Sequence, residues 1–134
     1  MTMRIGCVGC GNMGGAILAG LARSAGQGQT DAYALCGYNR TASRMRPLEE
    51  AGVQVMTSPL AVAENADIII LAVKPYQMRE VVGQLRPALD ANKVLVSVAA
   101  GITSNSLAQW AENACPVVRC MPNTPALVGM GVFA

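Results

Sequence analysis

The chain contains no histidine, few charged residues and very few aromatic ones. Without an imidazole, a Ser-His-Asp triad, a Cys-His pair and a histidine-ligated metal site are all excluded, and we predict no metal site. Charged residues make up 13% and hydrophobic residues 52% of the 134 residues, which rules out intrinsic disorder and favours much buried structure. A chain of this length forms one domain of ordinary size.

The sequence also lacks a long hydrophobic run and a strong excess of either charge. Its longest strongly apolar segment, residues 68–73, is far shorter than the roughly 20 residues of a bilayer-spanning helix. Ten basic residues against eight acidic ones give a net charge of +2, too little for a nucleic-acid-binding face. The amino end shows no secretory pattern. We therefore expect a cytoplasmic protein with neither a membrane nor a nucleic acid as partner.

Five cysteines are an odd number in a chain without an export signal, which favours reduced thiols used as small apolar side chains. Cys7 and Cys10 form a C-x-x-C pair, for which a redox or metal role is the alternative interpretation. We favour the apolar role because the pair lies where a glycine loop needs small residues and because no second C-x-x-C follows.

Apolar β segments alternate with helical patterns along the whole chain. We predict strands at residues 4–8, 32–38, 53–56, 67–73, 93–99 and 117–121. We predict helices at residues 16–22, 41–50 with Thr41 as its cap, 60–65, 76–89 and 104–113. Several strands are apolar throughout, which is typical of strands covered on both faces. The predicted class is α/β, a doubly wound parallel sheet of Rossmann type with helices on both faces.

Three glycines mark the junction between the first strand and the first helix, in the order Gly9-x-Gly11-x-x-Gly14. In a dinucleotide-binding fingerprint the first permits a tight turn, the second lets a pyrophosphate approach the backbone, and the third allows close packing of helix and strand. The phosphates then lie on amide groups at the helix start, where the helix dipole favours an anion. The alternative is a plain strand-to-helix turn.

The second strand ends in Asn39-Arg40-Thr41, without the carboxylate that an NAD site places there for the ribose hydroxyls. Arg40 supplies a planar cation suited to a phosphate, and its neighbours supply neutral hydrogen-bonding groups. We therefore predict NADP (NADPH) as the cofactor, with NAD as the alternative. A solvated surface arginine is the other interpretation of Arg40.

Further polar and small residues follow the later strands, where open α/β sheets bind ligands. Lys74, after the fourth strand, either neutralises a phosphate or is simply exposed, and the small residues Ala99 and Ala100 after the fifth admit a flat ring. Asn123, after the sixth strand, offers an amide to a ligand or forms an ordinary turn between two prolines.

Taken in order, these segments resemble the amino-terminal domain of pyrroline-5-carboxylate reductase. The matching segments are residues 5–14, 39–41, 71–75, 99–102 and 117–129, of which the last is the most specific. The resemblance implies hydride transfer from NADPH, less often NADH, to the C=N bond of 1-pyrroline-5-carboxylate, giving L-proline. The alternatives are another NADP-dependent oxidoreductase, of the deazaflavin-dependent or β-hydroxyacid dehydrogenase type, and a non-catalytic NADP-binding module.

The resemblance also implies which residues line the cofactor, and the strand-end chemistry adds Thr41. The predicted cofactor-binding residues are Val8, Gly9, Cys10, Gly11, Asn12, Met13, Asn39, Arg40, Thr41, Ala72, Val73, Lys74, Pro75, Val98, Ala99, Ala100 and Asn123. No catalytic residue is assigned. Gly14 stands where relatives often have alanine, a difference expected to be harmless, and Ser58-Pro59 stands where some relatives have an asparagine near the adenosine.

The family pattern includes a helical carboxyl-terminal domain that forms the dimer and supplies most of the imino-acid pocket. We expect residues 1–134 to be the dinucleotide-binding domain, cut off near 126–134 before that helical domain. The full-length enzyme is then expected to be a homo-oligomer, with an imino acid as its small-molecule partner.

Overall fold

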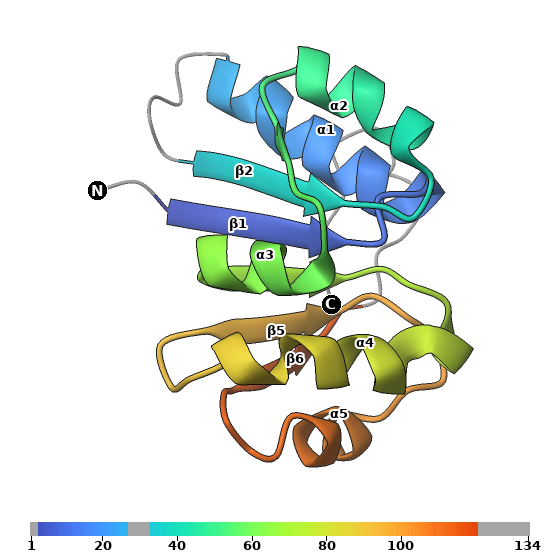
Figure 1. Cartoon of the computed structure of the whole chain (residues 1–134), viewed down its shortest axis with the longest axis vertical. Helices are drawn as coiled ribbons and strands as arrows, with labels where there is room; N and C mark the ends of the chain where they lie inside the picture. The colour runs from blue at the N-terminus through green and yellow to red at the C-terminus, as the bar shows by residue number, and fades with distance from the viewer. Residues whose placement is uncertain (1–2, 27–32, 121–134) are drawn as a thin grey trace.

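The computed structural model describes residues 3–26 and 33–120 and contains the predicted parallel sheet. The six strands are β1 (Met3–Val8), β2 (Tyr33–Tyr38), β3 (Gln54–Val55), β4 (Ile68–Leu71), β5 (Val94–Ser97) and β6 (Val117–Arg119). They lie in the order β3-β2-β1-β4-β5-β6, and every pair is parallel (Figure 1). The chain thus moves outward from β1 and returns to β4 on its other side, so the topological switch point lies between β1 and β4.

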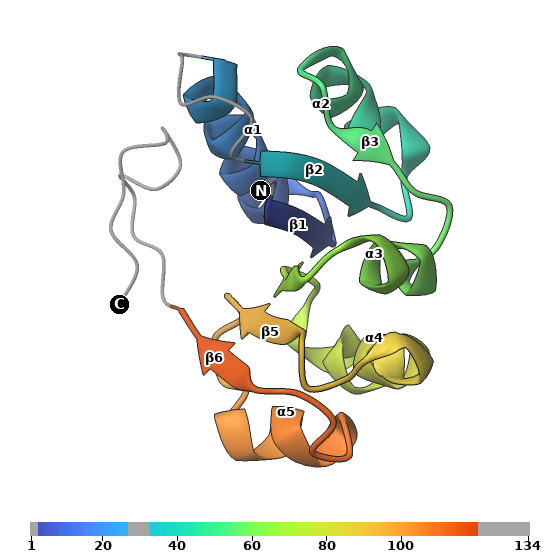
Figure 2. The same cartoon turned by 90° about the vertical axis from the view of Figure 1, so that its left-hand side faces the viewer.

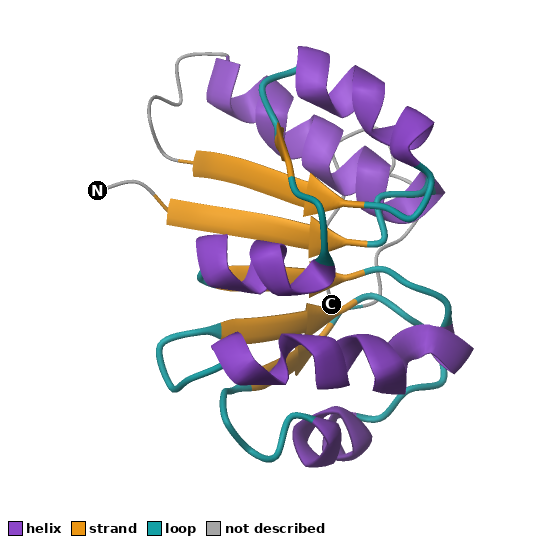
Figure 3. Cartoon of the chain, viewed as in Figure 1, coloured by secondary structure: helices purple, strands orange, loops and turns teal. Residues whose placement is uncertain are grey.

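Helices cover both faces of the sheet, as predicted (Figure 3). They are α1 (Asn12–Gly26), α2 (Arg46–Glu50), α3 (Pro59–Asn65), α4 (Met78–Leu85) and α5 (Ser104–Trp110), with the 3-10 helices η1 (Ala42–Met45), η2 (Pro75–Gln77) and η3 (Arg86–Ala88). One buried cluster joins α1 and α2 to the sheet, and a second joins α3, α4 and α5 to its opposite face, so that α1 and α4 lie on opposite sides (Figure 2). Among the described helices, none has the length and apolarity to cross a bilayer.

Two predicted helices are interrupted in the structure. The helix expected over residues 41–50 divides into η1 and α2, with Pro47 in the first turn of α2. Thr41 makes no side-chain capping hydrogen bond, so the prediction that Thr41 caps a helix is wrong. The helix expected over residues 76–89 likewise divides into η2, α4 and η3. Pro87, in η3, cannot donate the backbone hydrogen bond that would continue α4. By contrast, Ser58 does cap α3 and accepts a bond from the Ala61 amide at 3.1 Å.

Strand β1 is packed closely against α3. A side chain at Gly6 would place its Cβ 2.5 Å from Cγ1 of Val62 and 2.9 Å from Cβ of Ala66, so only glycine lets this helix lie directly on the strand. Val62 and Ala66 are completely buried. The close approach fixes the position of β1, whose carboxyl end carries the glycine loop.

A buried lysine holds the far end of α3. Lys93, directly before β5, is 8% exposed, and its ammonium donates hydrogen bonds to the carbonyl oxygens of Ala63 and Ala66, the latter at 2.9 Å. Cations are favourable at a helix carboxyl end, where carbonyl groups lack intrahelical partners. Lys93 therefore satisfies these buried acceptors.

An ion pair joins the starts of β1 and β4 at the opposite edge from the glycine loop. The Arg4 guanidinium donates to both oxygens of Asp67, at 3.1 and 2.8 Å. This contact lowers the pKa of the Asp67 carboxyl from its ordinary value and raises that of Arg4.

Candidate functional site

The glycine loop after β1 is a tight turn clamped to its neighbours. Gly9 has φ of +92°, a conformation that side chains rarely adopt, and a Cβ there would lie 2.8 Å from the backbone of Ala72 and of Val73. The amides of Gly9 and Cys10 both donate to the carbonyl oxygen of Tyr38, at 2.9 and 3.2 Å. The loop is therefore fixed to the ends of β2 and β4 as well as to β1.

The other two glycines of the motif also show the geometry expected of them. A Cβ at Gly14 would lie 2.4 Å from the carbonyl oxygen of Gly9 and 2.8 Å from Sγ of Cys7, so α1 packs directly on the loop. An alanine Cβ would therefore clash in this backbone, whereas the glycine present fits it, and nothing here conflicts with the expectation that glycine is harmless at this position. A Cβ at Gly11 would meet nothing within 4 Å, which leaves the loop open on the side where a ligand would approach.

The start of α1 offers unpaired amides to an anion. The first hydrogen bond of the helix runs from the Gly15 amide to the carbonyl oxygen of Gly11 at 2.9 Å. The backbone amides of residues 12–14, including those of Asn12 and Met13, therefore precede the first hydrogen bond within the helix. These donors and the positive end of the helix dipole suit a phosphate group. The donor set and the open side of Gly11 thus fit a pyrophosphate.

The thiols near the loop belong to the core. Cys10 is 1% exposed, and its Sγ donates to the carbonyl oxygen of Cys7 at 3.4 Å, so it can face a ligand only through its backbone. The hydrogen bond with Cys10, together with burial, raises the pKa of Cys7 well above its ordinary value, and burial raises that of Cys36 to about 11. All five cysteines are free and four of them are buried, as expected of small apolar side chains. The described residues contain no group of ligands able to hold a metal ion.

The turn after β2 presents Arg40 at the same edge of the sheet as the glycine loop. The Asn39 side-chain amide donates to the Thr41 carbonyl oxygen at 3.2 Å, which holds the turn, and the side chain of Arg40 is exposed. Neither ion pair recorded between described residues involves Arg40. The turn contains no carboxylate, so nothing within it opposes a phosphate.

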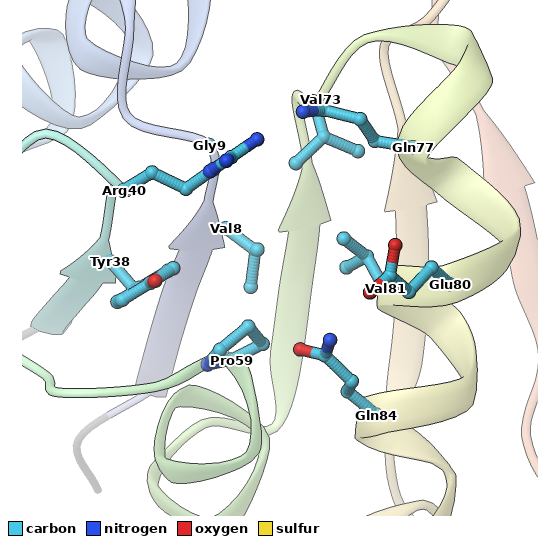
Figure 4. Close-up of a pocket in the computed structure, with 10 residues that line it drawn as sticks. All are labelled: Val8, Gly9, Tyr38, Arg40, Pro59, Val73, Gln77, Glu80, Val81 and Gln84. Atoms are coloured by element: carbon cyan, nitrogen blue, oxygen red, sulfur yellow. The ribbon is translucent and has the colours of Figure 1, made fainter.

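A pocket of about 280 Å³ lies between these segments and the helices α3 and α4 (Figure 4). Five of its residues lie at strand ends and in the turns that follow them, namely Val8, Gly9, Tyr38, Arg40 and Val73. The other five are Pro59, Gln77, Glu80, Val81 and Gln84. The residues from η2 and α4 were not predicted as site residues; their signal in the sequence is a polar row at helical spacing directly after Lys74-Pro75.

The remaining predicted residues follow β4 and β5 at the same edge, outside this pocket. Ala72 is half-buried while Lys74 and Pro75 are exposed; Val98 and Ala99 are half-buried and Ala100 is exposed. The two segments are adjacent, because the Val98 amide donates to the Leu71 carbonyl oxygen at 3.1 Å. Asn123 lies outside the described residues.

The strand order and the glycine loop together define a Rossmann-type domain. Residues 4–101 match the family described as "NADP oxidoreductase coenzyme F420-dependent", and the chain belongs to this family.

Within this class, the resemblance to pyrroline-5-carboxylate reductases is confirmed over nearly the whole chain. The chain is 39% identical over 133 residues to the pyrroline-5-carboxylate reductase of Escherichia coli (strain K12), covering 98% of this chain and 48% of that protein. Its fold matches the Coxiella burnetii enzyme with a TM-score of 0.85 and 32% identity, covering 99% of this chain and 48% of that one.

A further solved structure, the Plasmodium falciparum pyrroline carboxylate reductase with NADP bound, matches with a TM-score of 0.80 and 29% identity, covering 98% of this chain and 46% of that one. The chain spans about half the length of the curated relatives it matches.

Proposed function

We propose that the chain binds NADPH and serves as the cofactor-binding part of a reductase that transfers hydride to the C=N bond of 1-pyrroline-5-carboxylate, giving L-proline. The observation that carries this proposal is the placement of Gly9 and Arg40 on the wall of one pocket at the carboxyl edge of the sheet (Figure 4). The names of the relatives, and the NADP bound in the Plasmodium falciparum structure, support the choice of reaction and cofactor.

The pyrophosphate then lies against the backbone between Val8 and Met13. Arg40 and Thr41 hold the 2′-phosphate beside the ribose, and the segments after β4 and β5 flank the ribose and the nicotinamide. The residues assigned to the cofactor are Val8, Gly9, Cys10, Gly11, Asn12, Met13, Asn39, Arg40, Thr41, Ala72, Val73, Lys74, Pro75, Val98, Ala99, Ala100 and Asn123. NAD remains the alternative cofactor.

The proposed hydride transfer requires little acid or base catalysis from the residues of this chain. The cofactor supplies the hydride when bound, and a protonated cyclic imine is already electrophilic. The residues of this domain therefore act by holding the nicotinamide at a fixed position and by excluding water from it. The absence of histidine is compatible with such a reaction. We infer that the reductase acts in the cytoplasm, and the resemblance to the family implies a homo-oligomer.

Replacing Arg40 with alanine tests the cofactor assignment. The loss of a charge-assisted contact should weaken NADPH binding by about 1–3 kcal/mol, roughly 5- to 150-fold, and leave NADH binding nearly unchanged. Calorimetric titration of the chain with both nucleotides measures the difference, and Arg46→Ala, which removes another exposed arginine nearby, is the matched control. An equal loss for NADPH and NADH in Arg40→Ala contradicts the role of Arg40.

A chimera tests the reaction. The chain replaces the matching 133-residue segment of the Escherichia coli reductase, and proline formation from 1-pyrroline-5-carboxylate and NADPH is measured. We expect turnover, together with a fall in NADPH-dependent activity when Arg40→Ala is introduced. A folded chimera that binds NADPH but forms no proline refutes the proposed reaction.

One observation favours a second candidate, because the description of the matched family names coenzyme F420. In that case the chain passes hydride between a reduced deazaflavin and NADP. Oxidation of reduced coenzyme F420 by NADP in the presence of the chain would support this candidate. Binding of NADPH without any hydride transfer, in the chain or in the chimera, would instead identify a non-catalytic module.

A further inference from the structure

One end of the 280 Å³ pocket has no role in the function proposed so far (Figure 4). Gly9 and Arg40 account for phosphate groups at one wall, whereas the opposite wall is formed by α4 and the start of α3. This volume lies just below the usual range of ligand pockets, so the pocket has room for one flat ring system but not for a whole dinucleotide.

Part of the pocket lining is apolar. Val8, Val73 and Val81 line it from β1, the end of β4 and α4, and Pro59 closes it from the start of α3 (Figure 4). Aliphatic walls of this kind favour a flat aromatic ring, because the ring faces lose contact with water on both sides. Pro59 offers no side-chain hydrogen bond, so any recognition of the ring edge must come from other residues.

Those residues form a polar row at the start and along one side of α4. Glu80 and Gln84 lie on α4 and Gln77 is the residue directly before it; the three are three and four positions apart, and all of them line the pocket. In Figure 4 the ends of the Glu80 and Gln84 side chains project from α4 into the space facing Val8 and Pro59. Gln77 is partly engaged, because its Oε1 accepts a bond from the Lys74 amide at 3.3 Å.

Glu80 has no competing partner among the described residues. Neither recorded ion pair involves it, and its position in the first turn of α4 favours a negative charge. An ionised carboxylate only accepts hydrogen bonds, so it requires a donor on the ligand. The amide of Gln84 both donates and accepts. The pocket thus has a cationic wall at Arg40 and an acceptor wall at Glu80.

We propose that Glu80 and Gln84 recognise the amino edge of the cofactor's purine ring and make the site selective for a 6-aminopurine over a 6-oxopurine nucleotide. The proposal rests on the proposed function, since it takes NADP to be the ligand. A 6-oxopurine presents a carbonyl oxygen where the carboxylate of Glu80 needs a donor, and two acceptors that face each other repel and form no hydrogen bond. The charge of Glu80 also turns the phosphates toward Arg40, which fixes the direction of the bound nucleotide.

The test compares NADP with its hypoxanthine analogue, in which the 6-amino group is a carbonyl oxygen, by calorimetric titration of the purified chain. The native chain should prefer NADP by about tenfold or more, because the carboxylate loses its donor in the analogue. In Glu80→Gln, whose amide can face either group, the preference should fall to about threefold or less. Glu80→Ala should lose the preference as well. Glu64→Gln, an exposed site on α3 outside the pocket, is the matched control and should keep it.

The outcomes separate this inference from the proposed function. Equal binding of the two nucleotides by the native chain, or an unchanged preference in both Glu80 variants, overturns the role of Glu80 and leaves NADP binding intact. Binding of neither nucleotide refutes the proposed function and this inference with it. The native comparison needs no variant, so its result does not depend on the folding of a mutant.

Discussion

Replacing Gly14 with alanine should destabilise the protein although alanine is the better helix former. The new Cβ would lie 2.4 Å from the Gly9 carbonyl oxygen, 2.8 Å from Sγ of Cys7 and 3.0 Å from Cβ of Ala72. Two of these contacts involve backbone or a fully buried thiol, which move only when α1 shifts as a whole. Overpacking of this kind costs about 1–3 kcal/mol. The preference of a helix for alanine returns at most about 1 kcal/mol.

The next residue provides a matched control on the same helix. A Cβ at Gly15 would lie 3.5 Å from the Cys10 carbonyl oxygen, an ordinary contact, so Gly15→Ala should keep the helix preference without the clash. Urea unfolding of both variants should place Gly14→Ala lower in stability than Gly15→Ala by about 1–3 kcal/mol. Equal stabilities within about 0.5 kcal/mol would refute the close packing of α1 on the loop.

Three further changes test the framework that holds the site. Lys93→Met keeps the apolar stem but leaves the carbonyl oxygens at the end of α3 without a donor, so urea unfolding should show a loss of about 2–4 kcal/mol, and a negligible loss would exclude this role. Arg4 lowers the pKa of Asp67 below 3.8, so the stabilisation from the ionised Asp67 is present above that pH and is lost as the pH falls through the lowered pKa. Asp67→Asn should therefore flatten the acid side of a plot of unfolding free energy against pH. An unchanged acid side argues against the ion pair. Burial raises the pKa of Cys36 from 9.0 to about 11, so the stabilisation from the neutral thiol is present below pH 9 and declines toward pH 11. In Cys36→Ala the unfolding free energy should fall less steeply at alkaline pH. An equally steep fall would assign the alkaline loss of stability to other groups.

The sheet and the glycine loop were predictable from the sequence because both depend on local patterns. Continuous apolar runs mark buried parallel strands, and glycine spacing reports on the backbone itself. The helix boundaries were less predictable, since Pro47 and Pro87 each remove a backbone donor inside an expected helix, and part of that helix forms a 3-10 turn instead. Thr41 has the side chain of a helix cap, but the chain turns through η1 before a regular helix begins.

The α4 wall of the pocket was missed because periodicity analysis looks for buried apolar residues. Gln77, Glu80 and Gln84 look like the solvated side of an amphipathic helix, and they become pocket residues only when α3 brings Pro59 opposite them. The clash of an alanine Cβ at Gly14 could not be predicted from the sequence for a similar reason. The Gly9 carbonyl oxygen that this Cβ would contact is held in place by contacts of the loop with β2 and β4.

The close contacts on both sides of β1 have a consequence for ligand association. Because α3 packs against Gly6 and α1 packs against Gly14, the glycine loop that follows β1 has no free space in which to change its conformation. For a phosphate that binds at these amides as proposed, the entropy of ordering the loop was already lost when the protein folded. Binding therefore carries little further entropic cost for arranging the loop.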